Sequence, residues 1–370
     1  MFGVILISAV TLVHVYVFWR AGSVPFLRRQ LTTKTLIITA VVLWLMFLVG
    51  RVYGHDSQGT LATILELAGM TWMAVLFLIS VPLLVVDVIT GFGFLLSGAA
   101  PGMRGVAIIL GVVLSVIALL QGMRQPIVRS YEVQLTGLPP KLGGTVIVGL
   151  SDLHLGSMRN ERWLDARISQ VQAEKPDIIV LLGDIFEGHG RPSKELVAGL
   201  QGLKAPMGVW AVLGNHEFHG QDNGIVPLFR EAGITVLRNA RIMLRPGLAL
   251  SGVDDLTSNH RIGSNTDLIG RTLAAHSAGA TVLLSHTPWS AEQAAKAGAG
   301  LMLCGHTHGG QIWPFGYIVK RVYPLLAGRY DVDGMTVIVS RGAGSWGPPM
   351  RLWQPGEIIR VTLRAKKKDA

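Results

Sequence analysis

The sequence is poor in cysteine and lacks several common enzyme motifs. A single cysteine, Cys304, occurs among 370 residues, and one thiol excludes a framework of internal disulfides. Because Cys304 lies beside an apolar run, we expect a small core residue rather than a nucleophile. There is no glycine-rich phosphate loop of the Walker type, no Ser-His-Asp order and no internal repeat. The sequence therefore predicts neither a Walker-type nucleotide site nor a serine-hydrolase triad nor a repeat array.

Long apolar stretches dominate the first 125 residues. Four are long enough to cross a bilayer, which takes ~20 mostly apolar residues; they lie at 2–19, 35–50, 67–89 and 105–122. The first has neither a basic n-region nor a small-x-small cleavage site, so we interpret it as a membrane anchor rather than a signal peptide. We predict an all-α, four-helix transmembrane region over residues 1–125, in an integral protein of the cell membrane, and a linker over 126–144.

Two ionisable residues lie inside these apolar stretches. His14 falls in the first and Asp87 in the third, and such groups in membrane segments often mark function. The sequence shows no partner for either, so we assign them no role.

The net charge of +10 is compatible with nucleic-acid binding, but its distribution argues against it. Before residue 131, eight Lys and Arg stand against three Asp and Glu, and the bases flank the apolar stretches. Such a pattern suits lipid headgroups better than a nucleic-acid groove. We therefore expect the membrane as a partner and no nucleic acid. The short loops hold five basic residues on one side and three on the other, which favours an extracytoplasmic C-terminal domain.

One pattern recurs from residue 145 onward: an apolar, β-branched run ends in Gly, Asp, Asn or His. The five cases are residues 145–154, 177–184, 208–217, 281–288 and 301–310. Continuous apolar runs of this length indicate strands buried on both faces. Helix-like segments lie between several of them, such as 160–176 with Asn160 as its candidate cap. The alternation predicts an α/β fold with a largely parallel sheet, whose strand ends meet at one edge.

The polar residues at these strand ends form a set of candidate metal ligands. Carboxylate, amide and imidazole groups without a thiolate suit Mn, Fe, Zn or similar divalent ions. The eight residues are Asp152, His154, Asp184, Asn215, His216, His286, His306 and His308. They exceed what one tetrahedral ion needs and suit two ions ~3.5–4 Å apart that share a carboxylate. Any one alone is more often a cap, a turn former or a core residue, but five such strand ends favour a metal centre.

These motifs resemble the calcineurin-like metallophosphoesterases. "DLH", "GD", "GNHE", a lone His after a strand and "GHTH" occur in the order of that family. The resemblance covers residues 145–365 and implies a four-layer α/β/β/α sandwich after the transmembrane region. The "GHTHGGQ" ending and "GAGSWGPP" at 342–349 are similar to a membrane-attached subgroup that includes the UDP-2,3-diacylglucosamine hydrolases (pyrophosphatases).

The resemblance also implies a role for each residue in a metal-dependent phosphoric ester hydrolase with two divalent ions. Asp152, His154 and His308 bind the first ion, Asn215, His286 and His306 the second, and Asp184 bridges both. His216 contacts the phosphate and protonates the leaving oxygen. Glu187 matches a position whose carboxylate orients that histidine, although a solvated loop acid is an equal alternative. Glu217 is expected to support its turn.

Residues 311–330 follow the two-histidine turn and combine aromatic residues with Lys320 and Arg321. They are either an apolar, basic-edged lip that admits a lipid, with Trp313, Lys320 and Arg321 as substrate contacts, or a core-packing hairpin. We expect a phosphorylated lipid as substrate: a UDP-diacylglucosamine-like lipid if the domain is cytoplasmic, an outer-leaflet lipid if not. The alternatives are a non-catalytic membrane scaffold or sensor and a metal-dependent nuclease.

Overall fold

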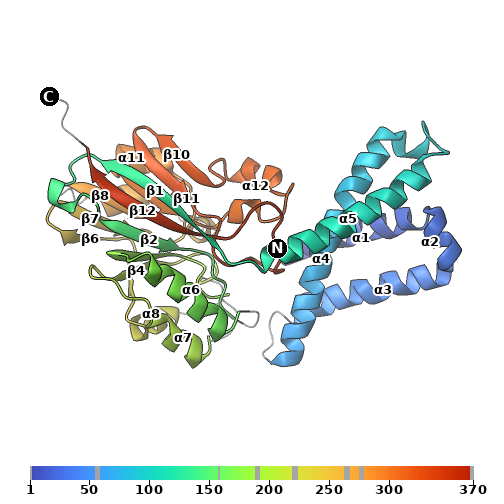
Figure 1. Ribbon diagram of the computed structural model, residues 1–370, viewed down its shortest axis with the longest axis horizontal. Helices are drawn as coiled ribbons and strands as arrows, with labels where there is room; N and C mark the ends of the chain where they lie inside the picture. The colour runs from blue at the N-terminus through green and yellow to red at the C-terminus, as the bar shows by residue number, and fades with distance from the viewer. Residues whose placement is uncertain are drawn as a thin grey trace. The chain divides into compact units, whose positions relative to one another are not determined.

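The computed structural model describes two compact units of the chain (Figure 1). The described residues are 2–54, 59–156, 159–187, 192–218, 224–261, 267–274 and 279–366. The first unit comprises the chain up to Met123 together with Gly347–Leu352, and the second comprises Arg124–Trp346 and the chain from Trp353 onward.

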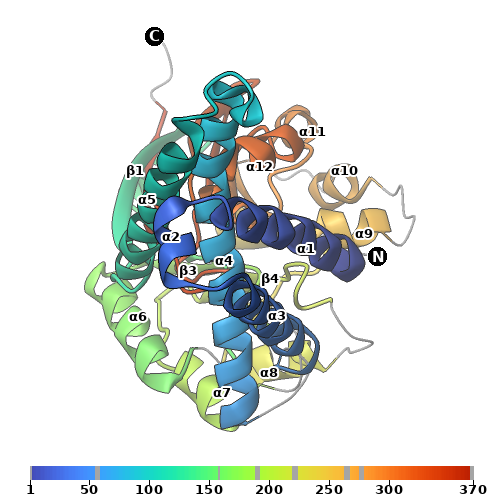
Figure 2. The same ribbon diagram turned by 90° about the vertical axis from the view of Figure 1, so that its right-hand side faces the viewer.

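Four long apolar helices build the first unit, which confirms the predicted layout of its membrane-length segments. They are α1 (Phe2–Ala21), α3 (Thr33–Val49), α4 (Thr60–Ile89) and α5 (Ala100–Gly122), with a short helix α2 (Pro25–Gln30) between the first two. Helix α4 contacts α1, α3 and α5 (Figure 2). It begins seven residues before the predicted start, because its first two turns include Glu66, which interrupts the apolar run but is buried.

A buried ionic cluster links three of these helices and provides the partners of Asp87 that the sequence could not show. The Asp87 carboxylate lies 2.6 Å from Nε of Arg20 and 2.8 Å from Nη2 of Arg104, and it accepts a hydrogen bond from Tyr16 Oη at 2.8 Å. His14 is likewise satisfied, with Nε2 3.0 Å from the Ala40 carbonyl oxygen and Nδ1 accepting from Trp72 Nε1. Both residues therefore stabilise the helix packing.

The same cluster changes the charge count that favoured an extracytoplasmic domain. Arg20 and Arg104 supply two of the five basic residues counted on one side, yet both are buried against Asp87. Setting them aside leaves three basic residues on each side. The loop charges therefore favour neither orientation.

Two six-stranded sheets form the centre of the second unit. The first has the order β1 (Ile127–Leu135), β12 (Glu357–Ala365), β2 (Val146–Leu150), β3 (Ile178–Leu182), β4 (Val209–Val212), β5 (Thr235–Val236). The second has the order β10 (Gly328–Val332), β11 (Met335–Val339), β9 (Leu301–Cys304), β8 (Ala280–Leu284), β7 (Leu248–Gly252), β6 (Ala240–Arg245). All five apolar runs identified in the sequence are strands of these sheets.

Most neighbouring strands in each sheet are parallel, as predicted, but three strand pairs are antiparallel. Strands β2 to β5 pair in parallel in one sheet, and β11, β9, β8 and β7 pair in parallel in the other. The pairs β12–β2, β10–β11 and β6–β7 are antiparallel. The carboxyl ends of β2, β3 and β4 therefore lie at one edge of their sheet, as do those of β8 and β9.

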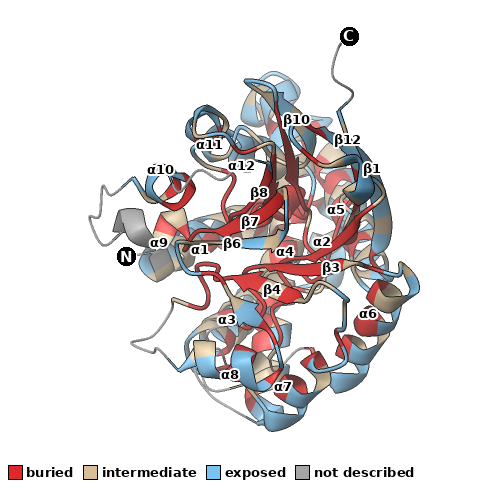
Figure 3. Cartoon of the chain, turned by 90° about the vertical axis from the view of Figure 1, so that its left-hand side faces the viewer, coloured by how far each residue is buried: buried red, intermediate tan, exposed pale blue. Residues whose placement is uncertain are grey.

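Three apolar clusters separate four layers, which confirms the predicted α/β/β/α sandwich. One cluster fills the space between the sheets; its side chains make strands such as β3 and β8 almost wholly buried (Figure 3). A second lies between the first sheet and helices α6 (Glu161–Ala173), α7 (Lys194–Leu200) and α8 (Ile225–Glu231). A third lies between the second sheet and α10 (Leu268–Leu273) and α11 (Ala291–Lys296), near α9 (Leu256–Arg261). Asn160 caps α6 as expected by accepting from the amide of Trp163.

Residues 126–144 do not form the predicted linker. They contain β1, which pairs in parallel with β12 along its whole length, and a 3₁₀ turn at Pro140–Leu142. Most β1 side chains are exposed or half-buried, because it is the edge strand. A strand of this kind lacks the continuous apolar run of a central strand, so its sequence resembles a polar connection.

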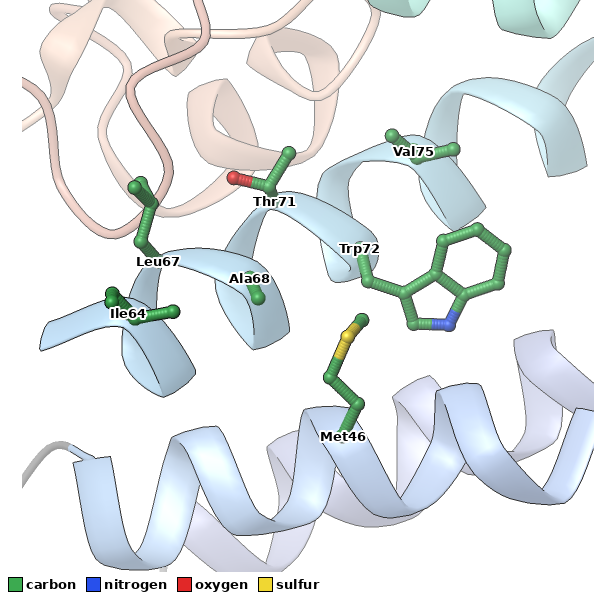
Figure 4. A pocket seen from close by; sticks show the side chains of 7 residues that line it. All are labelled: Met46, Ile64, Leu67, Ala68, Thr71, Trp72 and Val75. Carbon is green, nitrogen blue, oxygen red and sulfur yellow. The ribbon is translucent and has the colours of Figure 1, made fainter. Parts of the chain in front are cut away.

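The described residues of the first unit form an open, largely apolar groove. It measures about 370 Å³ and is lined by Met46, Ile64, Leu67, Ala68, Thr71, Trp72 and Val75. Met46 of α3 points toward Trp72 of α4 across it (Figure 4). An apolar surface of this kind on membrane-length helices matches the hydrocarbon of a bilayer, and it carries none of the predicted site residues.

Candidate metal centre

The loops that follow β2, β3, β4, β8 and β9 bring all eight predicted strand-end residues together. Asp152 and His154 follow β2, Asp184 follows β3, Asn215 and His216 follow β4, His286 follows β8, and His306 and His308 follow β9. Seven are buried and His306 is half-buried. Strand ends from both sheets thus contribute to one centre, as the apolar runs with polar ends predicted.

The backbone is held in an unusual conformation at this centre. Asp152, His154, Asp184, His306 and His308 all have φ between 48° and 72°, the left-handed region that non-glycine residues seldom adopt. Neighbouring glycines make the close approach of these loops possible. A Cβ at Gly214 would overlap the carboxylate of Asp184, and one at Gly344 would overlap the carbonyl oxygens of Asp152 and Leu153. Strain of this kind concentrates at functional sites.

The side chains form adjoining groups whose ligand atoms converge. In the first, Nε2 of His154 lies 3.2 Å from Nε2 of His308, which is 3.5 Å from Oδ1 of Asp152. In another, Nε2 of His286 lies 3.1 Å from both Oδ2 of Asp184 and Nδ1 of His306. Asp184 also groups with His154 and His216.

The residues present fit a divalent cation. Oδ1 of Asn215 is buried and has no hydrogen-bond partner among the described residues, and a buried oxygen of that kind requires a ligand or a water. Burial lowers the pKa of His306 to about 4. His306 is therefore a neutral imidazole at pH 7, the form that binds metals.

Two of the histidines are hydrogen-bonded through their second ring nitrogen, and a third has a carboxylate close to it. His286 Nδ1 lies 2.7 Å from the carbonyl oxygen of Leu182, and His306 Nε2 lies 2.8 Å from the hydroxyl of Tyr323. His154 Nδ1 lies 2.9 Å from the carboxylate of Glu187. Hydrogen bonds such as those of His286 and His306 fix the tautomer and the ring orientation of metal-binding histidines, and they leave His286 Nε2 and His306 Nδ1 facing the cluster.

Glu187 holds His216 by a hydrogen bond to its main-chain carbonyl. Nδ1 of His216 donates to the Glu187 carbonyl oxygen at 2.8 Å, whereas the Glu187 carboxylate is 3.7 Å from that nitrogen and only 2.9 Å from His154. Burial by itself lowers the pKa of His216, but the negative charges of Asp184 and Glu187 raise it above its ordinary value. This favours the protonated imidazole, which can donate a proton.

Glu217 supports the turns of the centre, as its place in "GNHE" suggested. Its buried carboxylate accepts from the backbone N–H groups of Asp184, Ile185, Phe186 and Gly214, at 2.7 to 3.0 Å. One side chain thereby joins the loop after β3 to the loop after β4.

Two further residues around the centre had only weak signals in the sequence. Tyr323 stands in the aromatic segment 311–330, but nothing local indicates that its hydroxyl reaches His306. Arg159 donates to the carbonyl oxygen and hydroxyl of Ser345 and so ties the loop after β2 to the "GAGSW" stretch. Burial lowers the pKa of Arg159 to about 10, which leaves the guanidinium charged at neutral pH.

The three predicted substrate contacts lie on the surface. Trp313 precedes α12 (Gly316–Val322), and Lys320 and Arg321 lie in its last turn; all three are exposed. The stretch from Trp313 to Val322 therefore does not pack in the core, whereas Leu325 and Tyr330, later in the segment, pack against the apolar cluster of the second sheet. The segment is tied to the candidate ligands by the hydrogen bond of Tyr323 to His306 and by that of the Gln311 amide to the His308 carbonyl oxygen.

The four-layer fold and this cluster of carboxylates and imidazoles define a metallophosphoesterase. Residues 145–310 match the family model described as calcineurin-like phosphoesterase, and the chain belongs to this family. It is therefore a metal-binding hydrolase of phosphoric esters.

Its relatives include both shorter and longer proteins. A metallophosphoesterase of Campylobacter jejuni is 33% identical over 262 residues, which cover 70% of this chain and 69% of that one. One of Aquifex aeolicus is 34% identical over 243 residues, covering 65% and 92%. The transmembrane protein with metallophosphoesterase domain of Bos taurus is 33% identical over 274 residues, covering 70% and 62%. The match thus spans less than two thirds of the Bos taurus relative. The four apolar helices, together with such relatives, identify a membrane protein.

Proposed function

We propose that the centre holds two divalent ions, Mn, Fe or Zn, and hydrolyses a phosphate ester or pyrophosphate bond of a phosphorylated lipid. The observation that carries the two-ion proposal is the position of Asp184, whose carboxylate belongs to two of the side-chain groups. Asp152, His154 and His308 would hold one ion, and Asn215, His286 and His306 the other. Asp184 would be the carboxylate that both ions share.

The residues around the ligands suit in-line attack at phosphorus. Bound divalent ions supply polarisation of the phosphoryl oxygens and a more acidic attacking water. Nδ1 of His216 is held by the Glu187 carbonyl, and Nε2 lies 4.0 Å from Oδ2 of Asp184. His216 therefore presents a proton at the edge of the cluster and would give it to the leaving oxygen.

A lipid substrate is supported by the attachment of the domain to membrane-length helices. Helix α5 ends at Gly122 and β1 begins at Ile127, a connection of four residues at ~3.3 Å each when extended. A phosphorylated lipid lies in the layer that a domain on so short a connection can reach. The candidates are a UDP-diacylglucosamine-like lipid, a polyprenyl phosphate and a phospholipid.

Hydrolysis with and without metal tests the phosphoesterase. Purified protein should hydrolyse an aryl phosphate mono- or diester, lose this activity on chelation and regain it when Mn, Fe or Zn is added. Asp184→Asn should abolish turnover. Activity that survives both treatments would refute the proposal.

Metal content separates the enzyme from a scaffold or sensor. About two ions per folded chain supports the two-ion proposal, whereas a well-folded chain without metal supports the scaffold. The presence of all seven ligands together with His216 favours the enzyme. Hydrolysis of single- or double-stranded DNA faster than of phosphate esters would indicate the nuclease instead.

The side of the membrane decides which lipids are available. A reporter fused after residue 366 should show whether the domain is cytoplasmic or extracytoplasmic. The UDP-linked lipid is then the first to test on the cytoplasmic side, and an outer-leaflet lipid on the other. If soluble phosphodiesters are cleaved far faster than every lipid tried, the lipid proposal fails while the phosphoesterase stands.

A further inference from the structure

The exposed apolar side chains of the second unit are concentrated at one place. Eight large apolar side chains are exposed among its described residues, and six of them lie together in sequence or in space: Trp313, Phe315, Tyr317, Ile318, Val322 and Trp353. The other two, Ile127 and Met243, stand on edge strands β1 and β6. We call the six residues the aromatic ridge. Single exposed apolar residues are ordinary, but such a concentration marks an interaction surface.

Helix α12, labelled in Figure 1, carries three of the six ridge residues, Tyr317, Ile318 and Val322. None of the residues Gly316–Val322 is buried, so the helix does not use its apolar side chains to join the domain core. Ile318 and Val322 are four residues apart and share a face. Trp353 comes from a distant part of the chain, and its ring centroid lies 5.0 Å from that of Trp313.

The charges within this segment have one sign. Lys320 and Arg321 are exposed in the last turn of α12, and residues 311–330 contain no Asp or Glu. Exposed Trp, Tyr and Phe together with Lys and Arg are the composition of segments that lie in the headgroup region of a bilayer. The basic side chains attract the phosphates of anionic lipids.

We propose that the aromatic ridge is a second membrane contact, which inserts into the headgroup region of a bilayer that contains anionic lipids. The occupant is a lipid surface because the chain is a membrane protein and because the basic charge of α12 complements anionic headgroups. The ridge and the charges of Lys320 and Arg321 thus act on the bilayer itself. The inference goes beyond the phosphoesterase proposal and does not require that the substrate be a lipid.

Spin labels on the full-length chain test the insertion. Cys304 is buried, so a nitroxide can be placed at Ile318→Cys in the ridge and, as the control, at Met243→Cys on β6. Both chains are placed in nanodiscs of phosphatidylcholine with phosphatidylglycerol, and the collision rates with oxygen and with a water-soluble nickel chelate are compared. We expect position 318 to favour oxygen and position 243 to favour the nickel chelate.

Two outcomes would overturn the proposal. If positions 318 and 243 are equally accessible to the nickel chelate, the ridge stands in water. If position 318 is inaccessible to both reagents, a protein surface covers it, either a second copy or another part of this chain.

The anionic-lipid requirement has its own test. In the spin-labelled chain, Lys320→Glu together with Arg321→Glu should raise the accessibility of position 318 to the nickel chelate. Transfer of the unsubstituted spin-labelled chain to nanodiscs of phosphatidylcholine alone should have the same effect. Metal content, measured in parallel, shows that the variant is folded. A depth at position 318 that is insensitive to both changes would refute the electrostatic contribution.

Discussion

The hydroxyl of Tyr323 lies 2.8 Å from Nε2 of His306, although His306 follows strand β9 and Tyr323 follows helix α12. Nδ1 of the same imidazole faces His286 at 3.1 Å, so the ring joins the metal cluster on one side and the tyrosine on the other. The Tyr323 ring stacks on Trp289, with centroids 5.4 Å apart. Tyr323 is therefore a positioning residue for a metal ligand.

Removal of this hydroxyl should weaken metal binding without unfolding the domain. We expect Tyr323→Phe to lower metal affinity about 10-fold, the lower range for loss of such outer partners. Excess metal should restore kcat. Titration of the metal-free protein with Mn or Zn measures the affinity. Tyr131→Phe in β1, which removes a hydroxyl elsewhere, is the control. An unchanged metal affinity would show that Tyr323 acts on packing alone.

His216 is expected to act as a proton donor. The decrease in kcat after its replacement should therefore depend on the leaving group of the ester. His216→Ala should lower kcat by ~10²- to 10⁴-fold for an alkyl phosphate, as for loss of a general acid. An acidic phenol leaves without protonation, so the aryl ester should lose much less. Steady-state rates with both esters, at unchanged metal content, check this. Equal losses for the two would contradict proton donation.

Glu217 should contribute to stability through the two loops that it joins. Burial raises the pKa of Glu217 to about 7, so at pH 8 Glu217→Gln replaces a charged acceptor of four backbone N–H groups with an amide that brings its own donors. We expect the free energy of unfolding to fall by about 2 kcal/mol, in the range for hydrogen bonds to charged groups. Thermal unfolding in detergent measures the change. Glu231→Gln, at an exposed acid of α8, should leave the transition where it is, and a similar shift in both variants would argue against a special role.

Asp87 should be essential to the first unit because it neutralises two buried guanidinium groups. Asp87→Asn leaves Arg20 and Arg104 buried without their carboxylate, and breaking a buried pair in this way costs about 3–5 kcal/mol. The apparent melting temperature of the full chain in detergent should fall sharply. Ser80→Ala, which removes a local hydrogen bond in the same helix, is the matched control. A stable Asp87→Asn protein would show that water reaches the cluster.

Cys304 should resist thiol reagents in the folded chain. Burial raises the pKa of its thiol above the ordinary value, so the thiolate fraction at pH 8 is lower than that of a free cysteine, and the side chain is inaccessible as well. A chromogenic disulfide reagent should react with no thiol at pH 8 until denaturant is added. Stoichiometric labelling of the native protein would contradict this expectation.

The sequence by itself indicated the strands and the candidate ligands at their ends, whereas the four layers followed from the resemblance to the metallophosphoesterases. Apolar runs such as 178–182 report burial on both faces directly, and the polar residue that follows each run must lie at a carboxyl end of the sheet. Asp184 and His286 could therefore be placed together although about a hundred residues separate them. The membrane-length helices could also be predicted, because the hydrocarbon core of a bilayer requires a continuous run of apolar residues.

The tertiary structure alone decided the features that depend on which surfaces meet. Strand β1 is an edge strand whose exposed side chains resemble those of a linker. The partners of Asp87, the main-chain carbonyl of Glu187, and the hydroxyl of Tyr323 are contacts between distant or irregular segments. Local periodicity reports which face of an element is buried but not what covers it, so these contacts had to come from the packed molecule.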